Sequence, residues 1–332
     1  MARTALVTGA GGFIGANLVR RLVAEGHRVH AIVRPGARAW RLDGAPEARR
    51  VELDLGDGEA VADAVAKLRP EWIFHLAAHG AYSWQTDVPE MARVNVAGTI
   101  ALVEAGARGG CEALIHAGSS SEYGYRDHAP GEEEPPQPNS PYAVTKAAAT
   151  MYCAHAARQG RLAATTLRLY SAYGPWEEPG RLMPSLVTHA QRGMLPPLVG
   201  PATARDFVHV GDVVDAFLLA AQAAGRGGLA PILNLGSGTQ TSLEELVAMA
   251  RRIFAVPVEP RWGTAAARAW DTDVWVADVR RIKRELGWAP QRSLEAGLRG
   301  LGEWLTGEPD VFDRYLAAAP ASPSTHAPPR SS

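Results

Sequence analysis

Residues 4–18 read TALVTGAGGFIGANL, and this stretch decides the fold. A short apolar run precedes the three glycines Gly9, Gly12 and Gly15, and an apolar helical pattern follows them. In a strand–turn–helix unit the first glycine makes the tight turn, the second lets the backbone approach a pyrophosphate, and the third lets the helix pack on the strand. The phosphates would then meet the N–H groups and the positive dipole end of the helix. The stretch predicts a dinucleotide site, and a plain glycine-rich turn is the alternative.

Outward from this stretch, short apolar runs alternate with amphipathic segments. This alternation predicts βαβ units with right-handed crossovers, and therefore a parallel sheet with helices on both faces. After Tyr173, proline and glycine pairs break the regularity, which indicates a smaller segment outside the sheet. We therefore expect an α/β fold, a doubly wound parallel sheet with a smaller segment inserted beyond it. The expected strands are 4–8, 28–33, 51–53, 72–76, 113–117, 164–169, 206–210 and 232–235, the last two returning to the main sheet, and the expected helices are 13–24, 59–68, 91–107, 142–157, 242–254, 280–286 and 294–305.

Composition and charge exclude several classes of protein. The 332 residues are 46% hydrophobic and have a formal net charge of -1. This apolar fraction is enough for a large core, and the near-neutral charge argues against a nucleic-acid binder. Cys111 and Cys153 are too few for a disulfide framework and lack the spacing of metal ligands, so we expect a cytoplasmic protein without a metal. No apolar run is long enough to span a membrane, and the first residues are typical of a strand rather than a signal peptide.

The end of the second expected strand indicates which dinucleotide binds. Arg34 stands where an acidic residue would hydrogen-bond a ribose 2′-hydroxyl and repel a 2′-phosphate. A guanidinium does the reverse, so Arg34 favours NADP(H) over NAD. A solvent-facing arginine is the alternative, because the chain uses arginine for almost all of its 34 basic residues. Asp54, followed by Leu55, comes after the third strand, where a carboxylate accepts from the adenine amino group or caps a turn.

The strongest catalytic signal is YAVTK at residues 142–146. Tyr142 and Lys146 are four residues apart and share one helix face. Tyrosine has a pKa of about 10, and a neighbouring ammonium moves it toward the useful acid–base range. Ser119 follows a strand at the carboxyl edge of the sheet, where its hydroxyl could hydrogen-bond a substrate carbonyl. Asn95 is a poor helix former within an expected helix, which leaves a polar structural or relay role and a surface position open.

Taken together, these motifs resemble the extended short-chain dehydrogenase/reductases that act on nucleotide sugars. The resemblance implies that Ser119, Tyr142 and Lys146 are catalytic, with Tyr142 as the acid–base and Lys146 also holding the cofactor ribose. The motifs span about residues 4–305 and are TGAGGFIG (8–15), FHLAA (74–78), NVAGT (95–99), GSSSEYG (118–124), YAVTK (142–146), RLYSAYGP (168–175), RDFVHVGDV (205–213) and LGW (286–288).

The resemblance also implies the domains, the binding residues and a homodimer built on helices 91–107 and 142–157. The dinucleotide-binding domain, of the Rossmann type, would comprise 1–174 and 205–240, and a smaller C-terminal substrate-binding domain for the sugar nucleotide would comprise 175–204 and 241–308. Independently of the resemblance, the Ala-, Pro- and Ser-rich composition of residues 317–332 predicts a disordered tail, taken as residues 309–332. Ser171 stands where many members of the family have asparagine. The cofactor-binding residues would be Gly9, Gly12, Phe13, Ile14, Gly15, Arg34, Asp54, Leu55, Leu76, Ala77, Ala78, Asn95, Tyr142 and Lys146. The substrate-binding residues would be Ser120, Ser121, Ser171, Arg205 and Arg268, with His79, Tyr82 and Ser83 facing either substrate or solvent.

Departures from the family pattern narrow the reaction. The 4,6-dehydratases place acidic residues where this chain has Ser120 and Ser121, and the elimination of water needs a carboxylate base, so a dehydratase is disfavoured. Family epimerases typically have an acidic residue after the second strand, whereas 4-ketoreductases can have arginine there, as Arg34 is here. We therefore expect NADPH-dependent reduction of a 4-keto nucleotide sugar. An NAD-dependent 4-epimerase is the alternative, and a non-catalytic NADP-binding sensor is a distant one.

Overall fold

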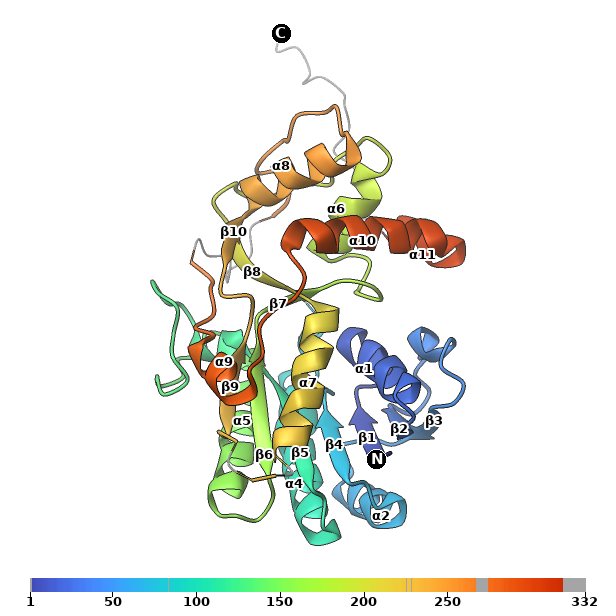
Figure 1. Cartoon of the computed structure of the whole chain (residues 1–332), viewed down its shortest axis with the longest axis vertical. Coiled ribbons are helices and arrows are strands. Elements are labelled where there is room, and N and C mark those ends of the chain that lie inside the picture. The colour runs from blue at the N-terminus through green and yellow to red at the C-terminus, as the bar shows by residue number, and fades with distance from the viewer. Residues whose placement is uncertain (1, 83, 225, 228, 267–273, 319–332) are drawn as a thin grey trace.

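The computed structural model describes residues 2–82, 84–224, 226–227, 229–266 and 274–318. Its central feature is one seven-stranded parallel sheet (Figure 1). The strand order reverses at the centre of this sheet, and such a switch point is where doubly wound sheets bind their ligands. From edge to edge the strands are β3 (Arg49–Glu52), β2 (Arg28–Val33), β1 (Thr4–Thr8), β4 (Trp72–His75), β5 (Ala113–Ser119), β6 (Ala164–Leu169) and β9 (Ile232–Leu235).

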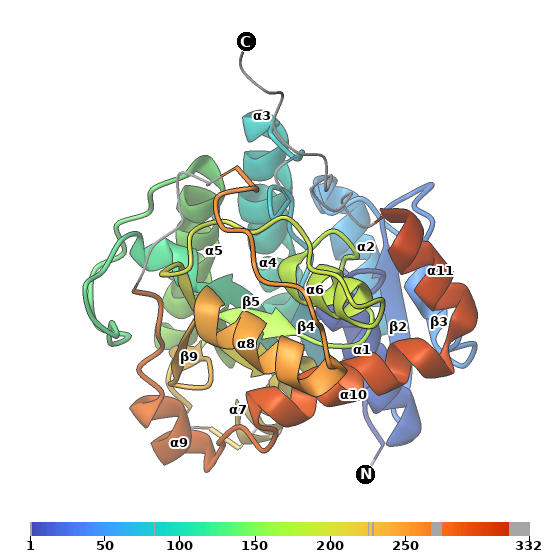
Figure 2. The same ribbon diagram turned by 90° about the horizontal axis from the view of Figure 1, so that it is seen from above.

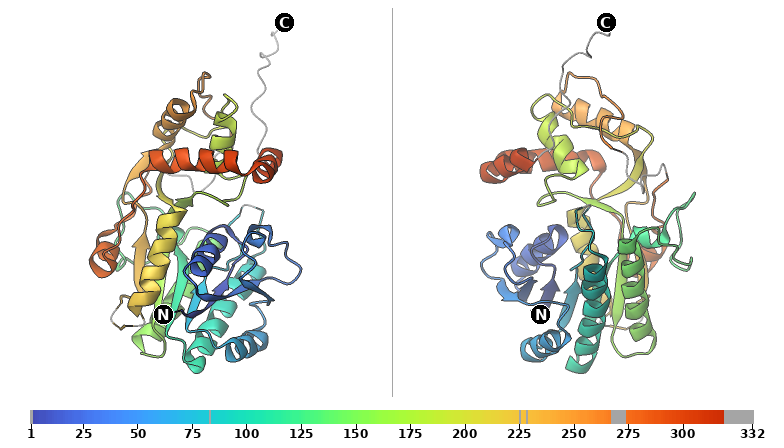
Figure 3. Two further views of the ribbon diagram at one scale, coloured as in Figure 1. Left: turned by 45° about the vertical axis from the view of Figure 1, so that its right-hand side comes forward. Right: turned by 180° about the vertical axis from the view of Figure 1, so that it is seen from behind.

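Helices cover both faces of this sheet, so its central strands are buried on both sides and are apolar along most of their length. One face is covered by α1 (Phe13–Ala24) and α7 (Val210–Ala224), with α9 (Arg280–Leu286) against α7 at the β9 edge. The other face is covered by α2 (Gly58–Leu68), α4 (Gly98–Gly109) and α5 (Pro141–Arg158), of which α4 and α5 lie side by side (Figure 3). The expected doubly wound α/β fold is confirmed.

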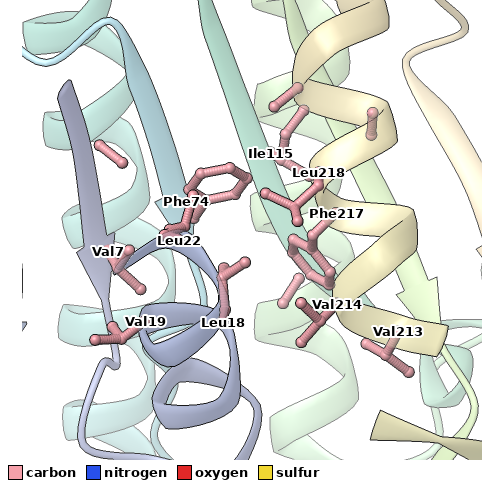
Figure 4. Packing of buried hydrophobic residues seen from close by; sticks show 14 of the residues in the cluster. Val7, Leu18, Val19, Leu22, Phe74, Ile115, Val213, Val214, Phe217 and Leu218 are labelled. Carbon is pink, nitrogen blue, oxygen red and sulfur yellow. The ribbon is translucent and has the colours of Figure 1, made fainter. Parts of the chain in front are cut away.

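The core between α1 and α7 fixes the start of α1. Leu18 and Leu22 of α1 lie near Phe74 of β4, and Phe217 of α7 completes the group (Figure 4). The rings of Phe74 and Phe217 are 6.5 Å apart, and all four side chains are fully buried. Each such burial stabilises the fold by about 1.5–3 kcal/mol. The glycine turn that precedes α1 is therefore held on a rigid base.

The expected helix 91–107 is not one regular helix. It consists of α3 (Val88–Met91), a π-helical segment η2 (Ala92–Ala97), and α4. A side chain at Gly98, where α4 begins, would bring its Cβ to 2.9 Å from the carbonyl oxygen of Leu55, so this junction packs tightly on the loop after β3. Such π-helical turns within helices often occur at functional sites, and this one contains Asn95.

The C-terminal part of the chain lies beyond the carboxyl ends of the main strands (Figures 1 and 2). It has its own hydrophobic cluster, centred on Leu186, Leu246 and Leu301. A three-stranded sheet joins it to the main body. Its elements are β7 (Ser171–Tyr173), β8 (Ala204–His209), β10 (Gln240–Ser242), α6 (Leu182–Ala190), α8 (Leu243–Phe254), α10 (Leu294–Gly307) and α11 (Pro309–Ala318).

Two expectations about this part are wrong. The strand expected at 206–210 does not return to the main sheet, because β8 pairs with β7 and β10 instead. Residues 309–318 are not disordered. They form α11, whose Val311 and Tyr315 are buried in the C-terminal cluster, because the Ala-, Pro- and Ser-rich composition that predicts a tail begins only at residue 317.

Candidate active site

The structure has a cavity of about 920 Å³ between the carboxyl edge of the main sheet and the C-terminal part. Its position at the switch point matches that of ligand sites in doubly wound proteins. Most of the residues expected to bind or react line it, namely Gly9, Gly12, Phe13, Ile14, Gly15, Arg34, Asp54, Leu55, Leu76, Ala77, Ala78, Ser119, Ser120, Tyr142, Lys146, Ser171 and Arg205.

The glycine turn fits the phosphates of a dinucleotide. Gly9 has φ +66°, and a Cβ there would lie 2.6 Å from the backbone nitrogen of Ala77, so both its conformation and its contact require glycine. Gly12 is the N-cap of α1, where no side chain caps the helix and no acidic residue occupies the first turn. The first N–H groups of α1 are consequently open to an anion that enters from the cavity.

The cavity wall that follows β2 and β3 includes the basic side chains of Arg34 and Arg38 and the carboxylate of Asp54. Arg34 follows β2 and lines the wall together with Arg38. The Asp54 carboxylate accepts from Arg93 at 2.9 Å and from the backbone N–H of Gly56 at 2.9 Å. The Gly56 hydrogen bond and Arg93 lower the pKa of Asp54. Asp54 is therefore an ionised acceptor at neutral pH.

Ser119 and Tyr142 approach each other from two elements. Ser119 ends β5 and caps the 3-10 turn η3 (Ser120–Tyr123), while Tyr142 lies in the first turn of α5, which Ser140 caps. Burial raises the pKa of Tyr142 to about 12, the Glu122 carboxylate adds to this rise, and a hydrogen bond with Ser119 opposes it. The hydroxyl pair is therefore protonated at neutral pH and can bind an oxygen atom in the cavity.

The structure does not support the expectation that the ammonium of Lys146 lowers the pKa of Tyr142. Nζ of Lys146 lies 3.0 Å from Nε2 of His116 on β5, and the strongest influences on Tyr142 are burial, Glu122, Arg181 and Ser119. Burial lowers the pKa of Lys146 itself to about 8. The long side chain reaches from α5 toward the sheet rather than along its own helix.

The carboxylate of Glu122 belongs to the support of the site rather than to its wall. Oε1 accepts from the backbone N–H of Ser119 at 2.8 Å and from the Thr150 hydroxyl at 3.0 Å, and Oε2 accepts from Nε of Arg168 at 2.8 Å. Glu122 is completely buried. It therefore does not supply the exposed base that a 4,6-dehydratase would need at this motif.

Two of the expected contact residues do not line the cavity, and Ser83 lies outside the residues that the structure describes. Asn95 is buried behind it, where its amide bonds the backbone of His79 and the Thr145 hydroxyl at 2.7–2.9 Å. This favours the polar structural role over a direct cofactor contact. Ser121 turns its hydroxyl to that of Ser119, 2.7 Å away. Arg268 lies outside the described residues.

Several cavity residues were missed by sequence reasoning. Arg181 lies 5.5 Å above the ring of Tyr82, and Arg205 lies 5.5 Å from the ring of Trp275. Glu177 is buried near Arg181, and burial raises the pKa of its carboxyl to about 8. The missed residues are in irregular segments, where no periodicity indicates which side chains face a cavity. For Glu177 and Arg181 the sequence signal was the density of Trp, Glu and Arg around 176–181, and for Trp275 there was none.

The residues that the structure describes contain neither a candidate membrane span nor a cluster of possible metal ligands. Within them, no helix has the length and apolarity to cross a membrane. No group of three or more His, Cys, Asp or Glu side chains in the same residues is placed to hold a metal ion.

The fold and the cavity together define a dinucleotide-binding α/β protein. Residues 5–236 match the family model described as the NAD dependent epimerase/dehydratase family. The chain belongs to this family, as the resemblance of its motifs implied.

Two curated relatives illustrate the range of the family. A UDP-glucose 4-epimerase of Mycolicibacterium smegmatis is 34% identical over 304 residues, which cover 88% of this chain and 95% of that protein. A dTDP-6-deoxy-L-talose 4-dehydrogenase (NAD(P)(+)) of Kitasatospora kifunensis is 32% identical over 310 residues, which cover 89% of this chain and 93% of that protein. Both are similar along nearly their whole length.

Solved structures agree. UDP-glucose 4-epimerase from Thermotoga maritima, solved with UDP-glucose, has a TM-score of 0.83 at 29% identity, covering 92% of this chain and 99% of that one. MoeE5, solved with UDP-glucose and NAD, has a TM-score of 0.79 at 34% identity with the same coverage. The comparisons therefore support an enzyme of the nucleotide-sugar epimerase/dehydratase type that uses a nicotinamide cofactor.

Proposed function

We propose that this protein is an NAD-dependent 4-epimerase of a nucleotide-diphosphate hexose. The observation that supports it most is the cavity itself, which brings the glycine turn, Ser119, Tyr142 and Lys146 to one wall and Arg205 to the other. Relatives at 34% and 29% identity, named as UDP-glucose 4-epimerases, favour this reaction over the reductase that Arg34 suggested.

The chain's own groups have separate tasks in this proposal. The N–H groups at the start of α1 bind the cofactor diphosphate, and Arg205 binds the diphosphate of the sugar nucleotide. Tyr142 acts through its phenolate, which is the minor form at neutral pH because its pKa is raised: the phenolate takes the proton from the sugar 4-hydroxyl and the phenol returns it, while Ser119 orients the same oxygen. When bound, a nicotinamide supplies the acceptance and return of a hydride, and the protein supplies position and electrostatics.

The dehydratase reaction is not part of the proposal. That reaction needs a base beside the sugar C5–C6 bond, and the carboxylate of the relevant motif, Glu122, is committed to Ser119, Thr150 and Arg168. The two positions where the 4,6-dehydratases have acidic residues are occupied by Ser120 and Ser121. Hydroxyl groups with ordinary pKa values are poor bases at neutral pH.

A second candidate is an NADPH-dependent 4-ketoreductase. Arg34 and Arg38 at the ribose end of the cavity favour it, because two guanidinium groups suit a 2′-phosphate. The relative named as a dTDP-6-deoxy-L-talose 4-dehydrogenase (NAD(P)(+)) also favours it. In that reaction Tyr142 only donates its proton, to the carbonyl oxygen at C4.

The deciding experiment is to denature the purified protein, identify any released dinucleotide, and then incubate fresh protein with UDP-glucose without added cofactor. An epimerase releases NAD in stoichiometric amount and forms UDP-galactose. A ketoreductase releases little, and oxidises NADPH only when a 4-keto nucleotide sugar is present. Neither activity, with NADP(H) binding intact, would point to the sensor and contradict both enzymatic proposals.

A further inference from the structure

Two histidines lie beneath the cavity, and the proposed function uses neither of them. His75 ends β4 and His116 lies in β5, where the parallel register sets them opposite each other. Their ring centroids are 5.3 Å apart, and both side chains are almost completely buried. Burial lowers the pKa of His75 to about 3 and that of His116 well below its ordinary value, so both rings are neutral at physiological pH.

The hydrogen bonds around His75 fix its tautomer. The Thr99 hydroxyl donates to the backbone oxygen of Asn95 at 2.6 Å, so at 2.8 Å it accepts from Nε2–H of His75. Nδ1 of His75 is then an acceptor, and the Thr8 hydroxyl donates to it at 2.7 Å. Both ring nitrogens of His75 are thus satisfied by threonines, and its role is structural.

His116 has the opposite tautomer because its partner is an ammonium group. The Lys146 ammonium can only donate hydrogen bonds, so Nε2 of His116 is the acceptor, and the distance from Nζ to Nε2 is 3.0 Å. The ring proton of His116 is therefore on Nδ1, which donates to the Thr166 hydroxyl at 3.2 Å. The hydrogen bond from Nδ1–H to Thr166 on β6 fixes the orientation of the ring, so that Nε2 faces Lys146. The position of the acceptor is therefore determined by β5 and β6.

We propose that His116 is a positioning residue for Lys146. Its Nε2 accepts a hydrogen bond from the Lys146 ammonium and so holds the ammonium at the floor of the cofactor cavity. Lys146 lines this cavity, and two of its three protons remain for hydroxyl groups that enter from above. The inference rests on the proposed function, in which Lys146 lies on the same wall of the cavity as Tyr142. It adds a residue that the Ser119, Tyr142 and Lys146 set does not contain.

The surroundings of Lys146 explain why an acceptor matters. Its side chain is 3% exposed, and burial lowers its pKa to about 8, against the opposing influence of Glu122 and Cys153. Glu122 faces it from η3, Cys153 from its own helix and His116 from β5. A buried ammonium without a hydrogen-bond partner is costly, so the loss of the His116 acceptor favours the neutral amine.

The chain offers an unusually clean test, because it has only three lysines, Lys67, Lys146 and Lys283. Lysine labelled with ¹³C and ¹⁵N gives three NMR signals, and the exposed Lys67 and Lys283 serve as internal references. The variants are His116→Gln, which places an acceptor near the position of Nε2, and His116→Asn, which is too short to do so. His75→Gln is the matched control in the neighbouring strand.

We expect Lys146 in His116→Asn to titrate about one to two pH units lower than in the wild type, because a hydrogen bond to a charged group is lost. The alkaline limb of kcat/KM should move in the same direction, with a loss of about tenfold or more at pH 8. His116→Gln should restore both readouts to near wild type. His75→Gln should lower the thermal stability without moving either.

An unchanged Lys146 titration in His116→Asn, or equal behaviour of the Asn and Gln variants, overturns the proposal. If His116→Asn does not fold, the ¹⁵N shifts of the wild-type imidazole decide: a proton on Nδ1 of His116 supports the proposal, and a proton on Nε2 contradicts it. These titrations need no substrate. A failure of the proposed epimerase activity therefore leaves the His116–Lys146 result readable by itself.

Discussion

The backbone N–H of Ser119 donates to Oε1 of Glu122 at 2.8 Å, and the same carboxylate accepts from Nε of Arg168 at 2.8 Å. The end of β5, which presents Ser119 to the cavity, is thereby tied to β6 through an ion pair whose side chains are 0% and 2% exposed. A buried pair of this kind fixes geometry, and removing one partner leaves an uncompensated charge.

Arg168→Met should therefore lower the free energy of unfolding by about 3–5 kcal/mol, because Glu122 remains buried without its partner. Adding Glu122→Gln in the same chain should recover much of this loss, since no charge is then left unpaired. Urea denaturation at pH 7 measures both variants. A loss below about 1 kcal/mol in the single variant would show that the pair contributes little to holding β5 on β6.

Tyr142→Phe should reduce turnover by about 10²- to 10⁴-fold, the usual contribution of a positioned acid–base group. Only the hydroxyl is removed, so folding should stay near wild type and any change in dinucleotide affinity should be much smaller than the change in turnover. Tyr152→Phe is the matched control, because Tyr152 is on the same helix and donates to Glu104 away from the cavity. Wild-type turnover in the Tyr142 variant would refute the acid–base assignment.

Arg34→Asp should weaken NADPH binding by at least about tenfold and change NADH binding much less, since a carboxylate repels a 2′-phosphate. Arg49→Asp on the neighbouring strand β3 is the control, because Arg49 is exposed and does not line the cavity. Fluorescence titration with both dinucleotides measures the ratio of affinities. A ratio that does not move would place Arg34 away from the ribose.

The sequence predicted the sheet and the glycine turn because their chemistry is local. Gly9 and Gly12 act through backbone geometry, and the period of the apolar residues sets the strands and helices. The position of Lys146 was not predictable in this way. Its partner His116 is 30 residues earlier in the chain, and only the register between β4, β5 and β6 brings the histidine under the helix.

The C-terminal part shows the same limit. Sequence reasoning placed residues 206–210 in the main sheet because an apolar strand gives no sign of which sheet it joins. It also missed Arg181 and Trp275, whose contacts with Tyr82 and Arg205 depend on how separate loops meet across the cavity. Substrate selectivity depends on such loops, which is why the sugar could not be named from the sequence.

Glu177 should make the stability of the protein fall with rising pH. Burial raises the pKa of Glu177 in the folded protein to about 8, above its ordinary value of 4.5. Its contribution to the free energy of unfolding is therefore fully present below about pH 4.5 and is lost as the pH rises through 8. Glu177→Gln should remove this dependence and lessen the loss of stability between pH 5 and pH 9 by a few kcal/mol. Urea denaturation across this range measures it, with Glu133→Gln, an exposed carboxyl, as control. Parallel curves for wild type and Glu177→Gln would mean that Glu177 is ionised in the folded protein.

The outer face of α5 predicts how the chain associates. Val144 and Met151 are seven residues apart, which places them on one helix face, and they are 51% and 62% exposed. With α4 beside α5, this face suits the four-helix homodimer that the family resemblance implies. We expect a dimeric mass in light scattering for the wild type and a monomeric mass for Met151→Arg, because a buried guanidinium without a partner opposes association. Leu219→Arg, on the opposite side of the sheet in α7, should remain dimeric. A monomeric wild type would contradict the prediction, and a dimeric Met151→Arg would move the interface to another face of the molecule.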